Sequence, residues 1–137
     1  MIVVDAGPLI ALFDSSDAAH TRCRGALRAI RERTSTTIAV LTEAFHILGP
    51  SSASSELLRD YVLHGGLDVW FMGRNGVARA FELMETYADH PMDFADASLV
   101  VAAETLGTRK VFTLDMKDFK AYRIRRGHRQ EPFEIVP

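Results

Sequence analysis

The sequence predicts an α/β domain with a mostly parallel central sheet flanked by helices. Short apolar runs alternate along the chain with longer segments that have helical periodicity. The short runs are continuously apolar, which indicates strands that are buried on both faces, as in a parallel sheet. With 137 residues the chain is long enough for one substantial core and too short for two. We therefore expect residues 1–137 to form a single domain.

The first half of the chain predicts two strands separated and followed by helices. Residues 2–4 (IVV) are β-branched and apolar and end at Asp5, which indicates a buried strand. Ala6-Gly7-Pro8 predicts a turn, after which Pro8 opens a short helix. The expected elements are a helix over 9–13, an amphipathic helix over 17–33, a strand over 36–40, and helices over 43–48 and 51–64.

The second half continues the alternation. The expected elements are a strand over 67–72, a helix over 77–87, an apolar helix over 94–106 ended by Gly107, a strand over 111–114 and a fifth strand over 133–136. Ligand sites in such sheets lie beyond the carboxyl ends of the strands. Asp5 and Asp115 each follow a strand directly, so we expect both to open onto that edge.

Composition excludes several classes of protein. Hydrophobic residues make up 47% of the chain and charged residues 25%, which is typical of a globular domain. No apolar run approaches the roughly 20 residues of a membrane span. The N-terminal MIVVDAG has no basic flank, so we expect neither a signal nor a transit peptide. Cys23 is the only cysteine, which excludes an internal disulfide, and we expect a cytoplasmic protein.

Charge is unevenly distributed along the chain. The net charge is −2, yet residues 109–129 carry eight basic and two acidic side chains, a net charge of +6. This segregation suits a phosphate-bearing ligand or an acidic protein partner, and a solvated charged surface is the plainer interpretation. Thirteen of the sixteen basic residues are arginine, which favours bidentate contacts with phosphate or carboxylate.

Four carboxylates are expected at one edge of the sheet. Asp5 and Asp115 follow strands, whereas Glu43 and Asp96 lie in the first turns of expected helices. Crowded carboxylates raise one another's pKa values, and a divalent cation relieves that repulsion. Mg²⁺ prefers such oxygen ligands and can activate water and brace a phosphate. The histidines are scattered and Cys23 stands alone, so no zinc set competes.

Each acid also has a purely structural interpretation. Asp5 ends a strand, Glu43 complements a helix dipole, and Asp115 suits a turn. Asp93, three residues before Asp96, resembles half of a capping box, and capping is the role we favour for it. Individually these signals are weak, but four acids at one edge form a much stronger signal.

Four segments together resemble the PIN-domain ribonucleases, and within them the VapC-type toxins of bacterial toxin–antitoxin pairs. The segments are IVVDAGPLIALFD, LTEAFHIL, MDFADASLVVAAETLG and VFTLDMKDF, in that order, and the resemblance covers nearly the whole chain. Many family members have Ser or Thr after the first acid, where this chain has Ala6-Gly7.

The resemblance implies a metal-dependent endoribonuclease. Asp5 and Asp96 would be the principal ligands of Mg²⁺ or Mn²⁺, with Glu43 and Asp115 completing the catalytic pocket. Thr113 would hold a carboxylate in place. Asp93 is not among the family's four usual acids, and we interpret it as a helix cap that reaches the metal through water.

The same resemblance implies an RNA substrate, a homodimer, and a cognate antitoxin whose C-terminal segment covers the acidic site. No membrane partner is implied. The candidates for contacts with the RNA backbone are Arg123, Arg125, Arg126 and Arg129.

Two other functions compete with this interpretation. A phospho-acceptor domain of the receiver type has adjacent acids after its first strand, whereas Asp5 is followed by Ala6-Gly7-Pro8. A non-catalytic PIN-like module would bind RNA or protein without cutting. Metal-dependent cleavage by a purified sample separates enzyme from module.

Overall fold

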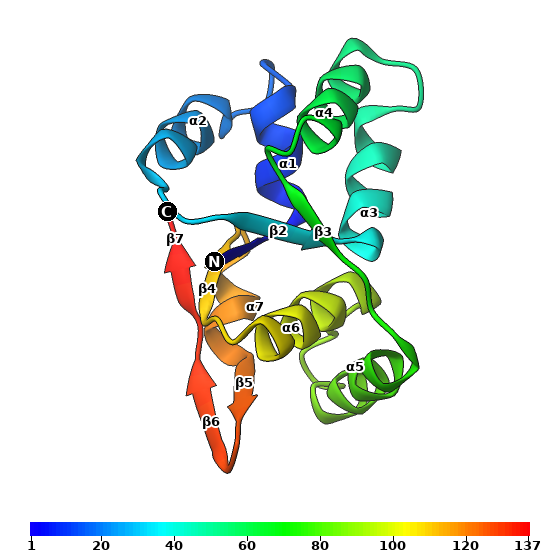
Figure 1. Cartoon of the computed structure of the whole chain (residues 1–137), viewed down its shortest axis with the longest axis vertical. Coiled ribbons are helices and arrows are strands. Elements are labelled where there is room, and N and C mark those ends of the chain that lie inside the picture. Colours follow the sequence, from blue (N-terminus) through cyan, green and yellow to red (C-terminus); the bar gives the residue numbers. More distant parts are fainter.

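A five-stranded, wholly parallel sheet forms the centre of the molecule. The computed structural model describes all residues, 1–137, and confirms the α/β fold that the sequence predicts. The strands lie in the order β3-β2-β1-β4-β7, and every neighbouring pair is parallel (Figure 1). Their bounds are Ile2–Val4 for β1, Thr34–Thr37 for β2, Asp68–Trp70 for β3, Lys110–Phe112 for β4 and Glu134–Val136 for β7.

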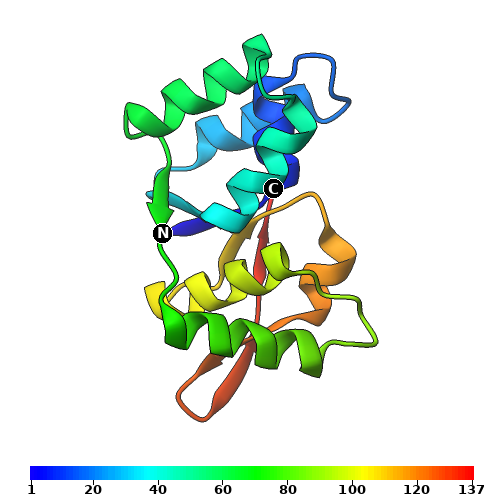
Figure 2. The same ribbon diagram turned by 90° about the vertical axis from the view of Figure 1, so that its right-hand side faces the viewer.

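Helices cover both faces of this sheet. The first four lie together on one face: α1 (Ala6–Phe13), α2 (His20–Ala29), α3 (Ile38–Leu48) and α4 (Ala53–Leu63). The other face is covered by α5 (Arg74–Thr86), α6 (Phe94–Leu106) and α7 (Met116–Ala121) (Figures 1 and 2). None of the seven helices combines the length and the apolar character that a membrane-spanning helix needs.

Helix α6 is the most deeply buried helix and matches its expected bounds. Its residues 97–103 are all buried, which explains why this run lacks charge. The Asp93 side chain accepts a 2.8 Å hydrogen bond from the backbone N–H of Asp96, and Gly107 ends the helix with φ 70°. Both features match known helix caps, so the first turn of α6, with Asp96 in it, is fixed in place.

The boundary between β2 and α3 differs from the expected one. The strand is Thr34–Thr37 and the helix begins at Ile38, so the apolar run over 38–40 is helical. Thr37 ends the strand because its side chain accepts a hydrogen bond from Val40 N–H. The polar strand is stable when buried because its three threonine hydroxyls are hydrogen-bonded, as in the 2.8 Å contact from Thr36 to Val4 O.

Other expectations are also corrected. Residues 6–8 are helical and belong to α1, because Asp5 caps that helix, and α2 is shorter than the expected 17–33. The C-terminal part contains two unexpected elements, namely α7 and an antiparallel hairpin of β5 (Arg123–Arg126) and β6 (Arg129–Pro132). This hairpin extends away from the sheet on the side of α5 and α6 (Figure 1).

Candidate active site

An acidic cavity of about 470 Å³ lies at the carboxyl ends of β1 and β4. Helix α3, the first turn of α6 and the start of α7 complete its wall. None of its ten lining residues is basic, and six are carboxylates: Asp5, Glu43, Asp93, Asp96, Asp115 and Asp118. The four acids expected at one edge of the sheet are therefore brought together.

Asp5 is buried and firmly held. Its backbone N–H donates to Phe112 O at 2.9 Å, which continues the pairing of β1 with β4. One carboxylate oxygen, Oδ1, accepts from Ala6 N–H at 2.8 Å, and Oδ2 accepts from the Thr113 hydroxyl at 2.7 Å. Burial raises the pKa of Asp5, and the two hydrogen bonds only partly oppose this effect.

Thr113 links two of the acids. It is fully buried directly after β4, and besides donating to Asp5 it accepts a 3.0 Å hydrogen bond from Asp115 N–H. One hydroxyl therefore fixes both the side chain of Asp5 and the backbone of Asp115.

Asp96 is a second carboxyl whose pKa is strongly raised. Its Oδ2 accepts a 2.9 Å hydrogen bond from the Tyr122 hydroxyl. Burial, followed by repulsion from Asp93, raises the pKa of Asp96 to about 7. Perturbed carboxylates in a cavity are typical of functional sites.

Glu43 and Asp115 lie at the exposed rim of the cavity. Glu43 is in the second turn of α3 rather than the first, because that helix begins at Ile38, so it does not serve the helix N-terminus. Desolvation raises the pKa of both carboxyls, with further repulsion from Asp93 at Glu43 and from Asp118 at Asp115.

The donor set fits a hard divalent cation. Carboxylate oxygens are the preferred ligands of Mg²⁺, and here no basic side chain lines the cavity to balance them. No three of these acids converge on one point as ligands of a single ion. That spacing suits Mg²⁺, which is usually bound by one or two carboxylates and keeps several waters.

The basic residues lie outside this cavity. The Arg123 guanidinium donates to the carbonyls of Lys120, Ala121 and Tyr122, so it caps the end of α7. Arg125 donates its backbone N–H to Glu104, eight residues or about 12 Å along α6 from Asp96. Arg126 contacts Glu131 at 3.4 Å. Arg129 is exposed and pairs with Arg126 across the hairpin.

Two residues of the site were not anticipated from sequence. Asp118 lines the cavity one turn after Asp115, and its spacing from Asp115 repeats that of Asp93 and Asp96. Tyr122 reaches Asp96 from a different element, and no local pattern in the sequence indicates that contact.

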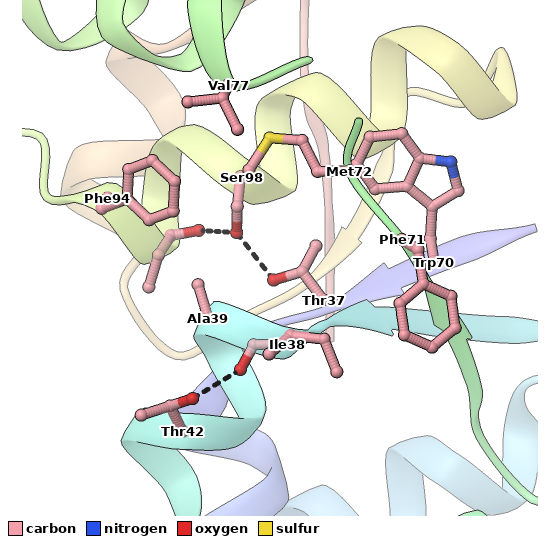
Figure 3. Close-up of a pocket in the computed structure, with 11 residues that line it drawn as sticks. Thr37, Ile38, Ala39, Thr42, Trp70, Phe71, Met72, Val77, Phe94 and Ser98 are labelled. Carbon is pink, nitrogen blue, oxygen red and sulfur yellow. Dashed lines mark hydrogen bonds between the residues drawn. The ribbon is translucent and has the colours of Figure 1, made fainter. Parts of the chain in front are cut away.

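An apolar cavity of about 540 Å³ lies on the other side of the same turn of α6. Phe94 and Ala95 line it, together with the start of α3 and the segment after β3 (Figure 3). The hydroxyls of Thr37 and Ser98 lie 2.6 Å apart within it. Near this cavity the large exposed side chains are Ile38, Phe71 and Phe81, which are 51%, 72% and 58% exposed.

Comparisons with known proteins find similar sequences and the same fold. Ribonuclease VapC26 of Mycobacterium tuberculosis (strain ATCC 25618 / H37Rv) is 27% identical over 142 residues, covering 99% of this chain and 100% of the relative. The crystal structure of VapC20 from M. tuberculosis, described as a sarcin-ricin loop cleaving toxin, matches with a TM-score of 0.82 at 18% identity, over 100% of both chains. A toxin–antitoxin complex from Klebsiella pneumoniae matches with a TM-score of 0.69 at 18% identity, over 87% of this chain and 90% of that one.

The family assignment rests on a match that spans most of the chain. The model of the PIN domain matches residues 2–124, which include all six carboxylates of the acidic cavity. The chain belongs to the PIN domain family.

Proposed function

We propose that the protein is a metal-dependent endoribonuclease, the toxin of a VapC-type toxin–antitoxin pair. The observation that carries this proposal is the acidic cavity, where six carboxylates meet without a basic side chain. The relative named ribonuclease VapC26 supports an RNA substrate. Phosphodiester hydrolysis is the chemistry that such an oxygen-rich pocket serves best.

Asp5 and Asp96 are the residues we propose to hold Mg²⁺ or Mn²⁺. An ion held there would supply activation of water and charge stabilisation at the scissile phosphate. Glu43 and Asp115, at the rim, are placed to accept hydrogen bonds from the attacking water. Thr113 keeps Asp5 turned toward the cavity, and Asp93 keeps the first turn of α6 in place.

We propose that RNA phosphates outside the scissile position contact the β5–β6 hairpin. Arg125, Arg126 and Arg129 are exposed on it, and phosphate contacts of this kind position a substrate without identifying its bases. We do not propose Arg123 as an RNA contact, because its guanidinium donates hydrogen bonds to backbone carbonyls at the end of α7.

An antitoxin is the proposed protein partner. The match to a toxin–antitoxin complex supports it, as does the unbalanced negative charge of the cavity. A basic side chain from the antitoxin's C-terminal segment would neutralise these carboxylates and exclude the metal.

We also propose that the chain forms a homodimer through the apolar cavity of Figure 3. Ile38, Phe71 and Phe81 are large exposed apolar side chains near it, and clustered exposed apolar side chains are typical of interaction surfaces. A second copy would cover it without blocking the acidic cavity beside it.

Cleavage assays on purified protein test the activity. We expect RNA cleavage that requires Mg²⁺ or Mn²⁺, stops with a chelator, and is not restored by Zn²⁺, because no His or Cys completes a zinc site. Asp5→Asn and Asp96→Asn should abolish cleavage while the fold survives. Asp93→Asn is the matched control and should be milder, because Asn also caps helices well.

Two outcomes contradict the proposal. Full activity in a folded Asp5→Asn variant removes the central role of the acidic cavity. Metal-dependent RNA binding without cleavage by the wild-type chain assigns it to the non-catalytic class of PIN-like modules.

A further inference from the structure

Tyr122 is a fully buried residue whose hydroxyl contacts Asp96, one of the acids that line the acidic cavity. Its hydroxyl donates a 2.9 Å hydrogen bond to Asp96 Oδ2, across 26 positions of sequence. The contact occupies one oxygen of Asp96 and leaves Oδ1 as the oxygen available to a ligand in the cavity. Tyr122 thereby selects the orientation of this carboxylate.

The ring of Tyr122 is itself held on several sides. It packs edge-on against Phe119 at 5.1 Å and Tyr87 at 5.2 Å between centroids. Phe119 in turn packs against Phe133 at 5.3 Å. Edge-to-face pairs of this kind add to the stability gained from burial.

The backbone around Tyr122 is fixed as well. Its N–H donates to Asp118 O at 3.1 Å, which closes α7, and the next N–H, of Arg123, donates to the Tyr87 hydroxyl at 3.0 Å. Helix α7 begins at the Asp115 cap and ends at Tyr122, so one short helix links Asp115 to Asp96. The aromatic cluster thus supports the acidic cavity from outside.

We propose that Tyr122 is a positioning residue, which holds Asp96 in the orientation that binds the divalent cation. The inference rests on the proposed function, because it takes Asp96 as a metal ligand. Hydrogen-bond partners of metal ligands commonly change metal affinity or activity by about 10- to 100-fold when they are removed. Tyr122 fits this role because its hydroxyl donates to Asp96, the proposed metal ligand, and because Tyr87 and Phe119 pack against its ring and hold it in place.

Tyr122→Phe tests the inference by removing the hydroxyl and keeping the ring. The measurement is the Mn²⁺ dissociation constant of the metal-free protein, followed by electron paramagnetic resonance of free Mn²⁺. We expect it to rise about 10- to 100-fold. At saturating Mn²⁺ the kcat for RNA cleavage should largely recover, whereas the Mn²⁺ concentration for half-maximal activity should stay high.

Tyr87→Phe is the matched control. It removes a hydroxyl from the same aromatic cluster, but that hydroxyl serves the backbone of Arg123 and not a carboxylate. We expect its Mn²⁺ affinity to stay close to that of the wild-type protein, even where the two variants lose similar thermal stability. Equal losses of Mn²⁺ affinity in both variants would reduce Tyr122 to a packing residue and overturn the inference.

A second measurement avoids substitution at Tyr122. The chain has three tyrosines, so uniform 3-fluorotyrosine labelling gives three ¹⁹F signals. As Mn²⁺ is added, the Tyr122 signal should broaden first, at the lowest Mn²⁺ concentration. The Tyr61 signal should broaden last, because Tyr61 lines a different cavity. Equal broadening of all three signals contradicts the placement of the ion beside Asp96.

Asp96→Asn separates this inference from the proposed function. Loss of Mn²⁺ binding in Asp96→Asn, with wild-type affinity in a folded Tyr122→Phe, would overturn the inference and leave the proposed metal site intact. Wild-type Mn²⁺ affinity in Asp96→Asn would overturn both.

Discussion

Thr113 donates a 2.7 Å hydrogen bond to Asp5, although the two residues are 108 positions apart in the sequence. The contact joins the carboxyl ends of the neighbouring strands β1 and β4. Parallel pairing of these strands in register is what brings the two side chains together. The same hydroxyl accepts from Asp115 N–H, so an error in this register would disturb both acids.

Thr113→Val should reduce RNA cleavage by about 10- to 100-fold, because it removes this hydroxyl and keeps the shape of the side chain. Thr108→Val is the matched control. Its hydroxyl donates to Met1 O at 2.7 Å at the opposite end of β4, far from the acids. Cleavage rates and thermal melting of both variants are the measurements. Equal loss of activity in the two would show that general destabilisation, and not the contact with Asp5, explains the effect.

The stability of the metal-free protein should fall as the pH rises. The pKa of Asp96 is raised to about 7 in the folded state, against about 3.9 in an unfolded chain. Between these values the folded state binds more protons than the unfolded state, so the free energy of unfolding decreases with pH. Burial raises the pKa of Asp5 as well, which acts in the same direction.

Thermal melting in the presence of a chelator measures this effect. We expect the melting temperature to fall between about pH 5 and pH 8, and Mg²⁺ to restore more stability at the upper end, because it binds the ionised carboxylates. Asp96→Asn should flatten the profile. Asp89→Asn, at an exposed position outside the cavity, should not. A melting temperature that rises over this range would contradict the assignment of a raised pKa to Asp96.

Disruption of the apolar cavity of Figure 3 should yield a monomer. Phe71 lines this cavity and is 72% exposed, and Phe81, 58% exposed, packs against the lining residue Phe94 at 6.0 Å between ring centroids. Replacing both with Ser removes two of the large apolar side chains that we propose to be covered by a second copy. Leu63→Ser is the control, because Leu63 is 81% exposed at the end of α4, away from this cavity. Sedimentation analysis should find a dimer for the wild-type chain and for Leu63→Ser. A dimer that persists in the double variant would place the interface elsewhere.

Three of the four acids, Asp5, Asp96 and Asp115, could be placed from sequence because each lies beside an element that the sequence marks clearly. The first-turn position expected for Glu43 was wrong, because α3 begins at Ile38. Asp5 and Asp115 follow buried strands, and Asp93 and Asp96 begin a helix whose apolar run and final Gly107 define both ends. The carboxyl ends of parallel strands share one edge, so correct strands were enough to bring these acids together.

The features that were missed depend on tertiary contacts. Ile38 and Val40 favour a strand by propensity, yet they begin α3 because Thr37 caps it and the sheet accepts the polar β2 instead. The sequence does not predict the β5–β6 hairpin, because tertiary contacts such as that of Arg125 N–H with Glu104 hold its strands. Tyr122 was missed for the same reason.

The arginines of the β5–β6 hairpin should contribute to RNA affinity without affecting the metal. Arg125→Gln with Arg126→Gln removes two positive charges from an exposed surface that lies about 12 Å along α6 from Asp96. If both contact phosphates, RNA affinity falls and the slope of log affinity against log salt decreases by roughly two. Mn²⁺ affinity should not change, because neither residue lines the acidic cavity.

Arg24→Gln with Arg28→Gln is the control, since it makes the same change in charge on α2, on the other face of the sheet. Binding titrations with RNA at several salt concentrations, alongside titrations with the antitoxin, decide the role of the hairpin. An unaltered RNA slope with loss of antitoxin binding would assign these arginines to the protein partner. If the hairpin positions RNA, its arginines should matter more than arginines elsewhere on the surface. An equal loss of RNA affinity in both double variants would therefore contradict this role and show that only net charge matters.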